Sequence, residues 1–419
     1  MAGGTAIPRS AYVWVWLPGA TEPVVAGRVV AVDDGRYVFA YGQTYLARPD
    51  AVPLYAPELP LREGPIEPRR DLSLAGCLRD ASPDAWGRRV IMARRFGHLD
   101  SDADTAALDE LTYLLSSGSG RIGGLDFQPS AAEYVARDET AELAELIDAA
   151  EAIEAGRPLS PALSEALTRG TSIGGARPKV TLVDQSRHLI AKLSATGDYY
   201  PVVKAEAVGM ILARRVGLHV AACEVIRCAG RDVLLVERFD RTAIPGQRRM
   251  MVSALTILAE NEMGARHASY PDIADAIRRT FADSAQSLRE LFARMVFNVC
   301  IGNTDDHLRN HAAFWDGAQL TLTPAYDLCP QLRSGETASH AVNITRTPGG
   351  RASQLRLCRK AAPDFLLSGH DADLIIEAQL EVISREWEEA ADEAQLTKSE
   401  RNYLWRRQIL NPYIHYDQA

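Results

Sequence analysis

One amphipathic stretch constrains the fold more than any other part of the chain. Between residues 288 and 299, apolar side chains recur at the i, i+3, i+4, i+7 spacing of a helix with one buried face. Residues 300–302 (CIG) are predicted to end this helix, and the sequence then becomes polar at once. Residues 303–311 (NTDDHLRNH) are therefore expected to form a loop directly after a buried helix, a common location for catalytic groups.

The polar loop holds two adjacent carboxylates, two histidines and two carboxamides. Asp305 and Asn310 have the Asp-x-x-x-x-Asn spacing in which protein kinases place a catalytic base and a metal-binding asparagine. Short Asp/Asn patterns are common, however, and Asn303, Thr304 or Asp305 could equally cap the next element. On its own, the loop leaves both interpretations open.

A second carboxylate is expected to return to this loop. Residues 312–315 and 320–322 read as a hairpin around Asp316-Gly317, and the pattern predicts that Asp327 follows the hairpin back toward Asp305 and Asn310. Phosphoryl transfer needs one carboxylate to accept the hydroxyl proton, and an Asn with a second Asp to hold Mg²⁺. The set therefore favours phosphoryl transfer.

Upstream, residues 171–179 (TSIGGARPK) form a glycine-rich segment before a predicted strand. Glycines allow a backbone to approach phosphates closely, although a plain glycine turn has the same composition, and the Walker A pattern is absent. Lys192 lies on the next predicted strand and Glu206 near the start of the following helix. A strand lysine paired with a helix glutamate is how kinases hold nucleotide phosphates, whereas each residue alone is more often a surface charge.

Residues 118–123 (GSGRIG) spell the Gly-x-Gly-x-x-Gly pattern of dinucleotide sites. Such a site needs a strand before the glycines and a helix after them. Here a helical pattern precedes the glycines and a strand-like segment follows them. We predict a turn.

The whole chain predicts an α+β protein. Its 419 residues are too many for one ordinary core. We expect a mixed amino-terminal domain at 1–135, a sheet-and-helix lobe at 136–245 and a mainly helical lobe at 246–419. Strands are predicted at 12–17, 29–32 and 37–41, then at 179–183, 187–193 and 233–239. Helices are predicted at 72–96, 105–115, 137–155 and about 203–216.

Composition narrows the function classes. A net charge of −9 argues against a general nucleic-acid-binding protein. Six scattered cysteines without a Cys-x-x-Cys pair, and a first segment without signal-peptide character, favour reduced thiols in the cytoplasm. The apolar run at 207–226 is interrupted by Arg214, Arg215, His219 and Glu224, so no membrane contact is expected.

Taken in order, five segments resemble the HipA family of serine/threonine protein kinases. They are residues 172–179, Lys192, residues 236–241 (VERFDR), residues 304–310 and residues 323–327 (TPAYD). Residues 82–89 (SPDAWGRR) are similar to the domain that precedes the kinase in full-length members. The resemblance implies a two-lobed protein-kinase-like fold that uses ATP and Mg²⁺.

The resemblance also implies roles for individual residues. Asp305 would be the catalytic base, Lys192 would hold the α- and β-phosphates, and Asn310 and Asp327 would be the metal ligands. Ser172 matches the serine that family members autophosphorylate, and its phosphate would disrupt the phosphate loop. Residues implied to bind the nucleotide are Ser172, Gly174, Gly175, Lys179, Lys192, Glu237, Phe239, Asp240 (near the ribose) and His307.

The chain departs from the family at two places. Asp306 stands where members often have glycine, and this extra carboxylate could shift the pKa of the base or recruit a cation. Arg177-Pro178 replaces a glutamine followed by a charged residue, and proline removes a backbone donor from the loop.

Family membership would make the protein a toxin. Its substrate would be a translation-related protein such as an aminoacyl-tRNA synthetase, and its partner a HipB-like helix-turn-helix antitoxin. Contact with operator DNA would then be mainly indirect, through the antitoxin.

Two alternatives remain open at this point. A metal-dependent phosphohydrolase could use Asp305, Asp306, His307, His311 and Asp327 as ligands for two metals. It would leave Lys192, Glu206 and the glycine-rich segment without a role. A kinase fold that has lost catalysis could instead serve as a scaffold or co-repressor.

Overall fold

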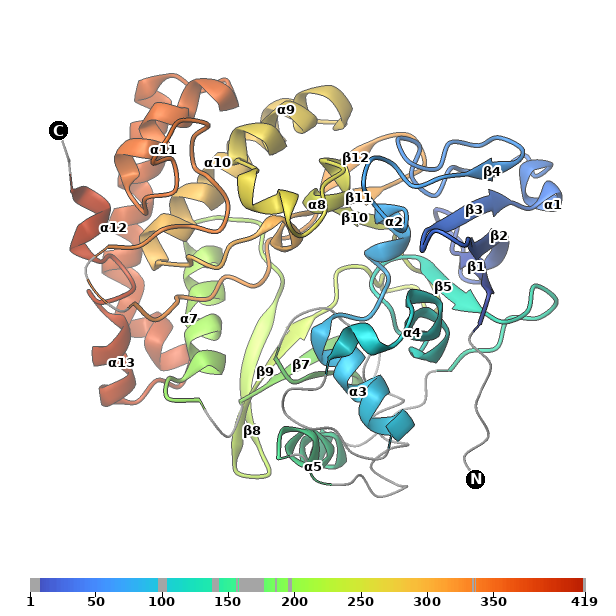
Figure 1. The fold of residues 1–419 in the computed structure, drawn as a ribbon. Coiled ribbons are helices and arrows are strands. Elements are labelled where there is room, and N and C mark those ends of the chain that lie inside the picture. Colours follow the sequence, from blue (N-terminus) through green and yellow to red (C-terminus); the bar gives the residue numbers. More distant parts are fainter. Residues whose placement is uncertain are drawn as a thin grey trace.

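The computed structural model describes residues 8–96, 104–137, 143–155, 157, 177–184, 187–194, 198–333, 335 and 337–416. Within these residues, three antiparallel sheets lie beside a group of helices formed by the carboxyl-terminal part of the chain (Figure 1). The amino-terminal sheet and the helices α10 to α13 occupy opposite sides of the molecule, with a four-stranded sheet between and below them. The mixture confirms the predicted α+β class.

The amino-terminal sheet has the strand order β4-β3-β2-β1-β5. Along β1, Ala11, Val13 and Val15 are fully buried, as the alternation of side chains along a strand requires when one face packs on a core. The predicted hairpin between β2 and β3 is confirmed, with Gly35 at φ +81° in its turn. Its strands are β1 Ser10–Val15, β2 Val24–Ala31, β3 Tyr37–Tyr41, β4 Pro65–Ile66 and β5 Leu125–Gln128.

The helices of this region differ from the prediction in two respects. The single helix expected at 72–96 is instead two, α2 (Gly76–Arg79) and α3 (Ala85–Phe96), because Pro83 cannot continue a helix that precedes it. The expected helix at 105–115 is a 3₁₀ turn, Thr105–Ala107, followed by α4 (Glu110–Ser116). A short α1 (Gln43–Leu46) follows β3.

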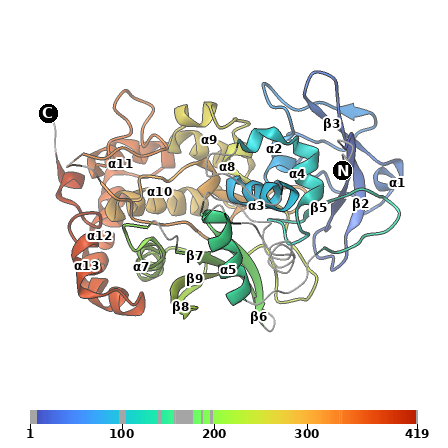
Figure 2. The same ribbon diagram turned by 60° about the horizontal axis from the view of Figure 1, so that its bottom comes forward.

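The second sheet has the order β6-β7-β9-β8. Sequence reasoning missed β8, whose polar and apolar residues alternate only weakly. One face of the sheet shares a buried cluster with Trp86 of α3 and Ile147 of α5, and the other face packs against α7 (Figure 2). The elements are α5 (Leu143–Glu154), β6 (Lys179–Asp184), β7 (Arg187–Leu193), α7 (Val202–Arg215), β8 (Cys223–Cys228) and β9 (Arg231–Glu237).

The remaining chain forms a small sheet and a helical lobe. Strands β10 (Met251–Ser253), β11 (Ala312–Trp315) and β12 (Leu320–Leu322) pair in that order, which confirms the predicted hairpin. The helices are α8 (Ala254–Ile257), α9 (Tyr270–Thr280), α10 (Ser284–Ile301), α11 (Leu355–Ala361), α12 (Gly369–Glu393) and α13 (Lys398–Leu404). The 3₁₀ turns are Gly264–His267, Leu308–Asn310, Ala362–Phe365 and Pro412–His415.

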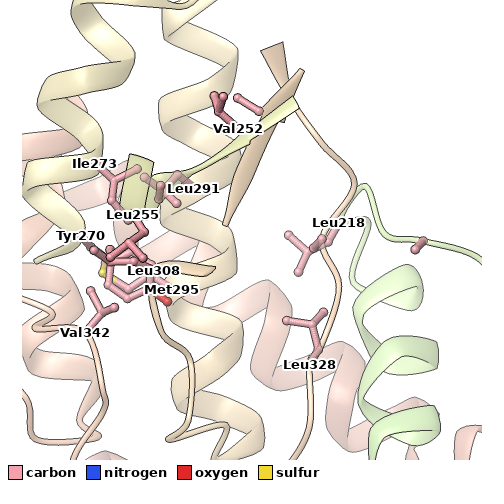
Figure 3. Close-up of a cluster of buried hydrophobic side chains, with 14 of the residues drawn as sticks. Leu218, Val252, Leu255, Tyr270, Ile273, Leu291, Met295, Leu308, Leu328 and Val342 are labelled. Atoms are coloured by element: carbon pink, nitrogen blue, oxygen red, sulfur yellow. The ribbon is translucent and has the colours of Figure 1, made fainter. Parts of the chain in front are cut away.

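Helix α10 is the predicted buried helix, and it supports the polar loop. Gly302, at φ +69°, ends it in the left-handed conformation that glycine adopts without strain. Figure 3 shows Leu308, from the loop, against Met295 of α10 and Tyr270 of α9. Leu308 is 1% exposed, so it anchors the loop in the lobe. The domain boundaries predicted at 135/136 and 245/246 stay predictions.

Candidate functional site

Lys192 lies at the centre of the site. Its Nζ, from β7, donates to Glu206 Oε1 of α7 at 2.5 Å and to Asp327 Oδ1 at 2.6 Å. Burial by itself would lower the pKa of Lys192, but the attraction of Asp327 and Glu206 outweighs it and raises that pKa. The predicted pairing of Lys192 with Glu206 is confirmed, and the ammonium is held fully charged.

Asp327 follows β12 in an unusual backbone conformation. Its φ of +61° is left-handed, a conformation that costs free energy for a residue other than glycine but that aspartate adopts more readily than most. Burial would raise the pKa of its carboxyl, but Lys192 outweighs burial and holds that pKa at about 2. The side chain is 41% exposed, so the ionised carboxylate is only partly buried and also faces the cavity.

The loop after α10 is joined to the segment around Asp327. Asn303 Nδ2 donates to the Asp327 carbonyl oxygen at 3.3 Å, and Tyr326 Oη donates to the Arg309 carbonyl oxygen at 2.6 Å. The predicted return of the chain after the hairpin is thus confirmed. Asp305, His307, Asn310 and Asp327 all line one cavity of about 1050 Å³, together with Lys179 and Lys192.

Asp305 is exposed to this cavity. The surrounding walls partly desolvate its carboxyl and raise the pKa, and the negative charges of Asp327 and Asp306 act in the same direction. His307 opposes them. A carboxylate with a raised pKa is a better proton acceptor than an ordinary aspartate.

Asp306 points in the other direction, into the helical lobe. It is 1% exposed, accepts a hydrogen bond from Tyr270 Oη and contacts His311 Nε2 at 3.0 Å. Asn298 Nδ2 donates to the same tyrosine oxygen at 3.0 Å. Burial would raise the pKa of Asp306, but His311 and the hydrogen bonds outweigh it and lower that pKa. Asp306 therefore ties the loop to the helical lobe, and its Oδ2 contacts both protein partners.

We expect Asp306→Ala to lower the free energy of unfolding by about 3 kcal/mol at neutral pH, because Tyr270 and His311 lose a buried partner. Urea unfolding measures the change, and Asp305→Ala is the matched control, since it removes the adjacent, exposed carboxylate. Because folding lowers the pKa of Asp306, its contribution is present above the unfolded-state pKa and is lost as pH falls through the folded-state value. An equal fall in the free energy of unfolding for Asp306→Ala and Asp305→Ala would contradict the buried, stabilising role of Asp306.

The segment after β9 holds a second buried ion network. Asp240 is 4% exposed, and its carboxylate accepts from Arg238 at 2.7 Å, from Arg241 at 2.9 Å and from the Gly123 backbone N–H at 2.7 Å. Burial would raise the pKa of Asp240, but the two arginines outweigh it and lower that pKa. Arg238 and Arg241 also donate to the carbonyl oxygens of Gly120, Arg121 and Gly123.

Residues 118–123 are thus a turn, as predicted, and they dock the amino-terminal region onto the segment after β9. The role of Asp240 beside a ribose stays a prediction, and these contacts do not favour it. Glu237 ends β9 with its N–H bonded to the Ala222 carbonyl oxygen at 2.8 Å. The Phe239 ring lies 5.5 Å from that of Tyr326, so this segment also reaches the loop before Asp327.

A contact between Lys179 and Asp84 completes the described part of the site. Lys179 is 5% exposed on β6 and contacts Asp84, at the start of α3, with 3.3 Å between Nζ and Oδ2. Sequence reasoning gave Asp84 no role, although its motif (SPDAWGRR) was noticed. The predicted residues Ser172, Gly174 and Gly175 lie outside the described residues.

None of the helices in the described residues is both long and apolar enough to cross a membrane. In the same part of the chain, no group of three or more His, Cys, Asp or Glu side chains is arranged to hold a metal ion. Asp306 and His311, two ligands that the hydrolase would need, contact each other inside the helical lobe, and this contact disfavours the two-metal hydrolase.

Comparisons with known proteins agree with this geometry. Residues 171–414 match the family model described as HipA-like C-terminal domain, and residues 15–128 match the HipA N-terminal domain. The putative kinase Y4mE of Sinorhizobium fredii is 26% identical over 341 residues, which cover 75% of this chain and 76% of that protein. The serine/threonine-protein kinase toxin HipA of Shewanella oneidensis is 27% identical over 183 residues, or 38% of this chain and 42% of that one.

A solved structure of HipA from Shewanella oneidensis, in complex with HipB and operator DNA, superposes with a TM-score of 0.68. The two chains are 17% identical, and the match covers 96% of each. At this identity the likeness shows a shared fold. It confirms the predicted two-lobed, HipA-like fold with its mixed amino-terminal region and helical carboxyl-terminal lobe.

Proposed function

Because the chain belongs to the HipA family, we propose that it is an ATP- and Mg²⁺-dependent serine/threonine protein kinase. The observation that carries the proposal is the contact of Lys192 with both Glu206 and Asp327, at 2.5 and 2.6 Å. Kinases pair a strand lysine with a helix glutamate to hold the α- and β-phosphates of ATP. Here the same lysine also contacts the carboxylate that would bind metal.

Asp305 is the general base of the proposed reaction. It takes the proton from a serine or threonine hydroxyl, whose oxygen then bonds to the γ-phosphorus as the bond to ADP breaks. Lys192 holds the α- and β-phosphates. His307 and Lys179, which line the same cavity, lie near the phosphates as well. The backbone at Glu237 and Phe239 contacts the adenine.

Asn310 and Asp327 fit a Mg²⁺ ion that is bound together with phosphates. Both line the cavity, and the Asp327 carboxylate is ionised and partly exposed. Mg²⁺ takes oxygen ligands and commonly uses only one or two from the protein, with waters and phosphate oxygens completing its shell. When bound, the ion neutralises the negative charge of the transferring phosphate.

The protein is further proposed to act as the toxin of a toxin–antitoxin pair in the cytoplasm. The HipA chain that shares its fold was solved with HipB and operator DNA, which supports a HipB-like helix-turn-helix antitoxin as a partner here. The net charge of −9 supports a DNA contact made through that antitoxin. A translation-related protein such as an aminoacyl-tRNA synthetase is the proposed substrate.

Incubation of the purified chain with radiolabelled ATP and Mg²⁺ tests the kinase proposal. Label that becomes bound to protein, either to the chain itself or to a protein in a lysate, is the expected result. Release of free phosphate without protein labelling would favour the hydrolase. The absence of both reactions would favour a scaffold without catalysis.

We expect Ser172→Ala to remove autophosphorylation while the variant still phosphorylates its protein substrate. Ser172 matches the serine that family members modify, and alanine lacks the hydroxyl that receives the phosphate. Phosphopeptide mapping of the radiolabelled chain measures the change, with Thr171→Ala as the neighbouring control. Unchanged label in Ser172→Ala would assign the modified hydroxyl to another residue.

A further inference from the structure

The segment between α2 and α3 contacts both lobes at the cavity. Asp80 accepts hydrogen bonds from the Ser253 backbone N–H at 2.7 Å and from its hydroxyl at 2.8 Å, on the side of the helical lobe. Arg309, in the loop that contains Asp305, lies 3.5 Å from the same carboxylate. Four residues later, Asp84 contacts Lys179 of β6 in the other lobe. Residues 80–84 of the amino-terminal region therefore form part of the cavity wall.

The two oxygens of Asp84 have different partners. Oδ1 accepts the Gly87 backbone N–H at 2.8 Å, which is the capping bond that begins α3. Oδ2 lies 3.3 Å from Lys179 Nζ. The side chains of Asp84 and Lys179 are only 13% and 6% exposed. Because the capping bond fixes the rotation of the carboxylate, the helix itself aims one oxygen at the lysine.

The contact is electrostatically weak for a buried ion pair. Burial raises the pKa of Asp84 to about 6, although Lys179 acts against this change. Burial and the like charge of Lys192 together lower the pKa of Lys179, although Asp84 and Asp327 act against this change. For Asp84, removal from water thus costs more than the attraction of Lys179 returns. A group with more negative charge that enters the cavity would attract this lysine more strongly than Asp84 does.

We propose, on the basis of the kinase function proposed above, that Asp84 belongs to the nucleotide site as an internal anion. Its carboxylate holds Lys179 until a nucleotide phosphate takes the place of Asp84 as the partner of this lysine. Lys179 and Asp84 both line the cavity that contains Lys192 and Asp327. An ammonium has three donors, so Lys179 can move its hydrogen bond from a carboxylate oxygen to a phosphate oxygen without losing charge. Asp84 opposes the incoming phosphate in two ways, by competing for the lysine and by like-charge repulsion.

This arrangement links the amino-terminal region to nucleotide binding. When a bound phosphate takes Lys179 from Asp84, the contact between the start of α3 and β6 is weakened. The linkage is reciprocal, so loss of this contact strengthens nucleotide binding. The contact at Asp80, on the other lobe, does not involve Lys179 and is expected to remain.

Isothermal titration of the full chain with ADP and Mg²⁺ tests the proposal. Asp84→Asn is the informative variant, because asparagine caps a helix as well as aspartate does but carries no charge. We expect this variant to bind ADP roughly threefold to tenfold more tightly than the unmodified chain. Glu67→Gln is the control, since it removes one negative charge from an exposed ion pair with Arg36 in the same region, and its Kd should not change.

A double-mutant cycle identifies the partner through which Asp84 acts. Lys179→Met should weaken ADP binding, and in that background Asp84→Asn should change the Kd by less than about twofold. An unchanged or weaker Kd for Asp84→Asn alone would overturn the proposal. An equal gain in both backgrounds would overturn the role of Lys179 in it. If the unmodified chain binds no ADP, the assignment of the cavity as a nucleotide site is wrong, and the proposed role of Asp84 is wrong for the same reason.

Discussion

Replacement of Asp327 by alanine is expected to abolish Mg²⁺-dependent phosphoryl transfer, with a loss on the order of 10³-fold or more. The side chain is the ionised carboxylate that faces the cavity, and it also contacts Lys192. Its removal takes away a metal ligand and one of two anions that position the phosphate-binding lysine. The folded state should be little affected, because Glu206 still pairs with Lys192 and the Asp327 side chain is 41% exposed.

Asp327→Asn is the matched variant. Asparagine tolerates the left-handed conformation at φ +61° and keeps the shape of the side chain, so any loss reports on the charge rather than on the backbone. The measurements are label transfer from radiolabelled ATP at several Mg²⁺ concentrations, together with thermal unfolding. Retained activity in both variants would exclude Asp327 as a metal ligand. A large fall in Tm would show that its main role is structural.

Asp305→Asn is expected to lower kcat by about 10²- to 10⁴-fold, which is the usual contribution of a general base. The expected change in nucleotide affinity is small, since the base acts on the hydroxyl of the acceptor protein. Asp305 must be ionised to accept a proton, so kcat of the unmodified enzyme should rise as pH increases through a pKa that lies above the usual aspartate value. The asparagine variant should lack this rise.

The Asp305→Asn variant also distinguishes the kinase hypothesis from the scaffold hypothesis. If the protein acts by catalysis, expression of Asp305→Asn in cells should no longer arrest growth, whereas binding to an antitoxin should persist. Unchanged toxicity and regulation in this variant would favour the scaffold. Full activity in the labelling assay would instead move the role of base to another residue.

Much of the site could be predicted because it is encoded locally. The period of apolar residues in α10 identified a buried helix, and a run of polar residues after Gly302 identified the loop. The turn residues Asp316-Gly317 identified the hairpin that brings Asp327 back. The pair of Lys192 and Glu206 could be predicted because kinases place a strand lysine and a helix glutamate in this order after a glycine-rich segment.

Other features could not be predicted from local patterns. Asp306 looked like a second cavity carboxylate, yet it turns inward to Tyr270, 36 residues away along the chain. The family resemblance places Asp240 near the ribose, which stays a prediction, and the structure adds a hydrogen bond from Gly123, 117 residues away. The direction of each of these two side chains depends on packing.

Local patterns were enough to predict most helices and strands, the polar loop after α10 and the family resemblance, because helix periods, turn residues and motif spacing involve residues within a few positions of one another. Only the tertiary structure decided that Asp84 meets Lys179, 95 residues away, and that residues 80–84 join the wall of the cavity. The physical reason is that such contacts depend on how separate elements pack, and packing places a charge beside a partner that no spacing along the chain specifies.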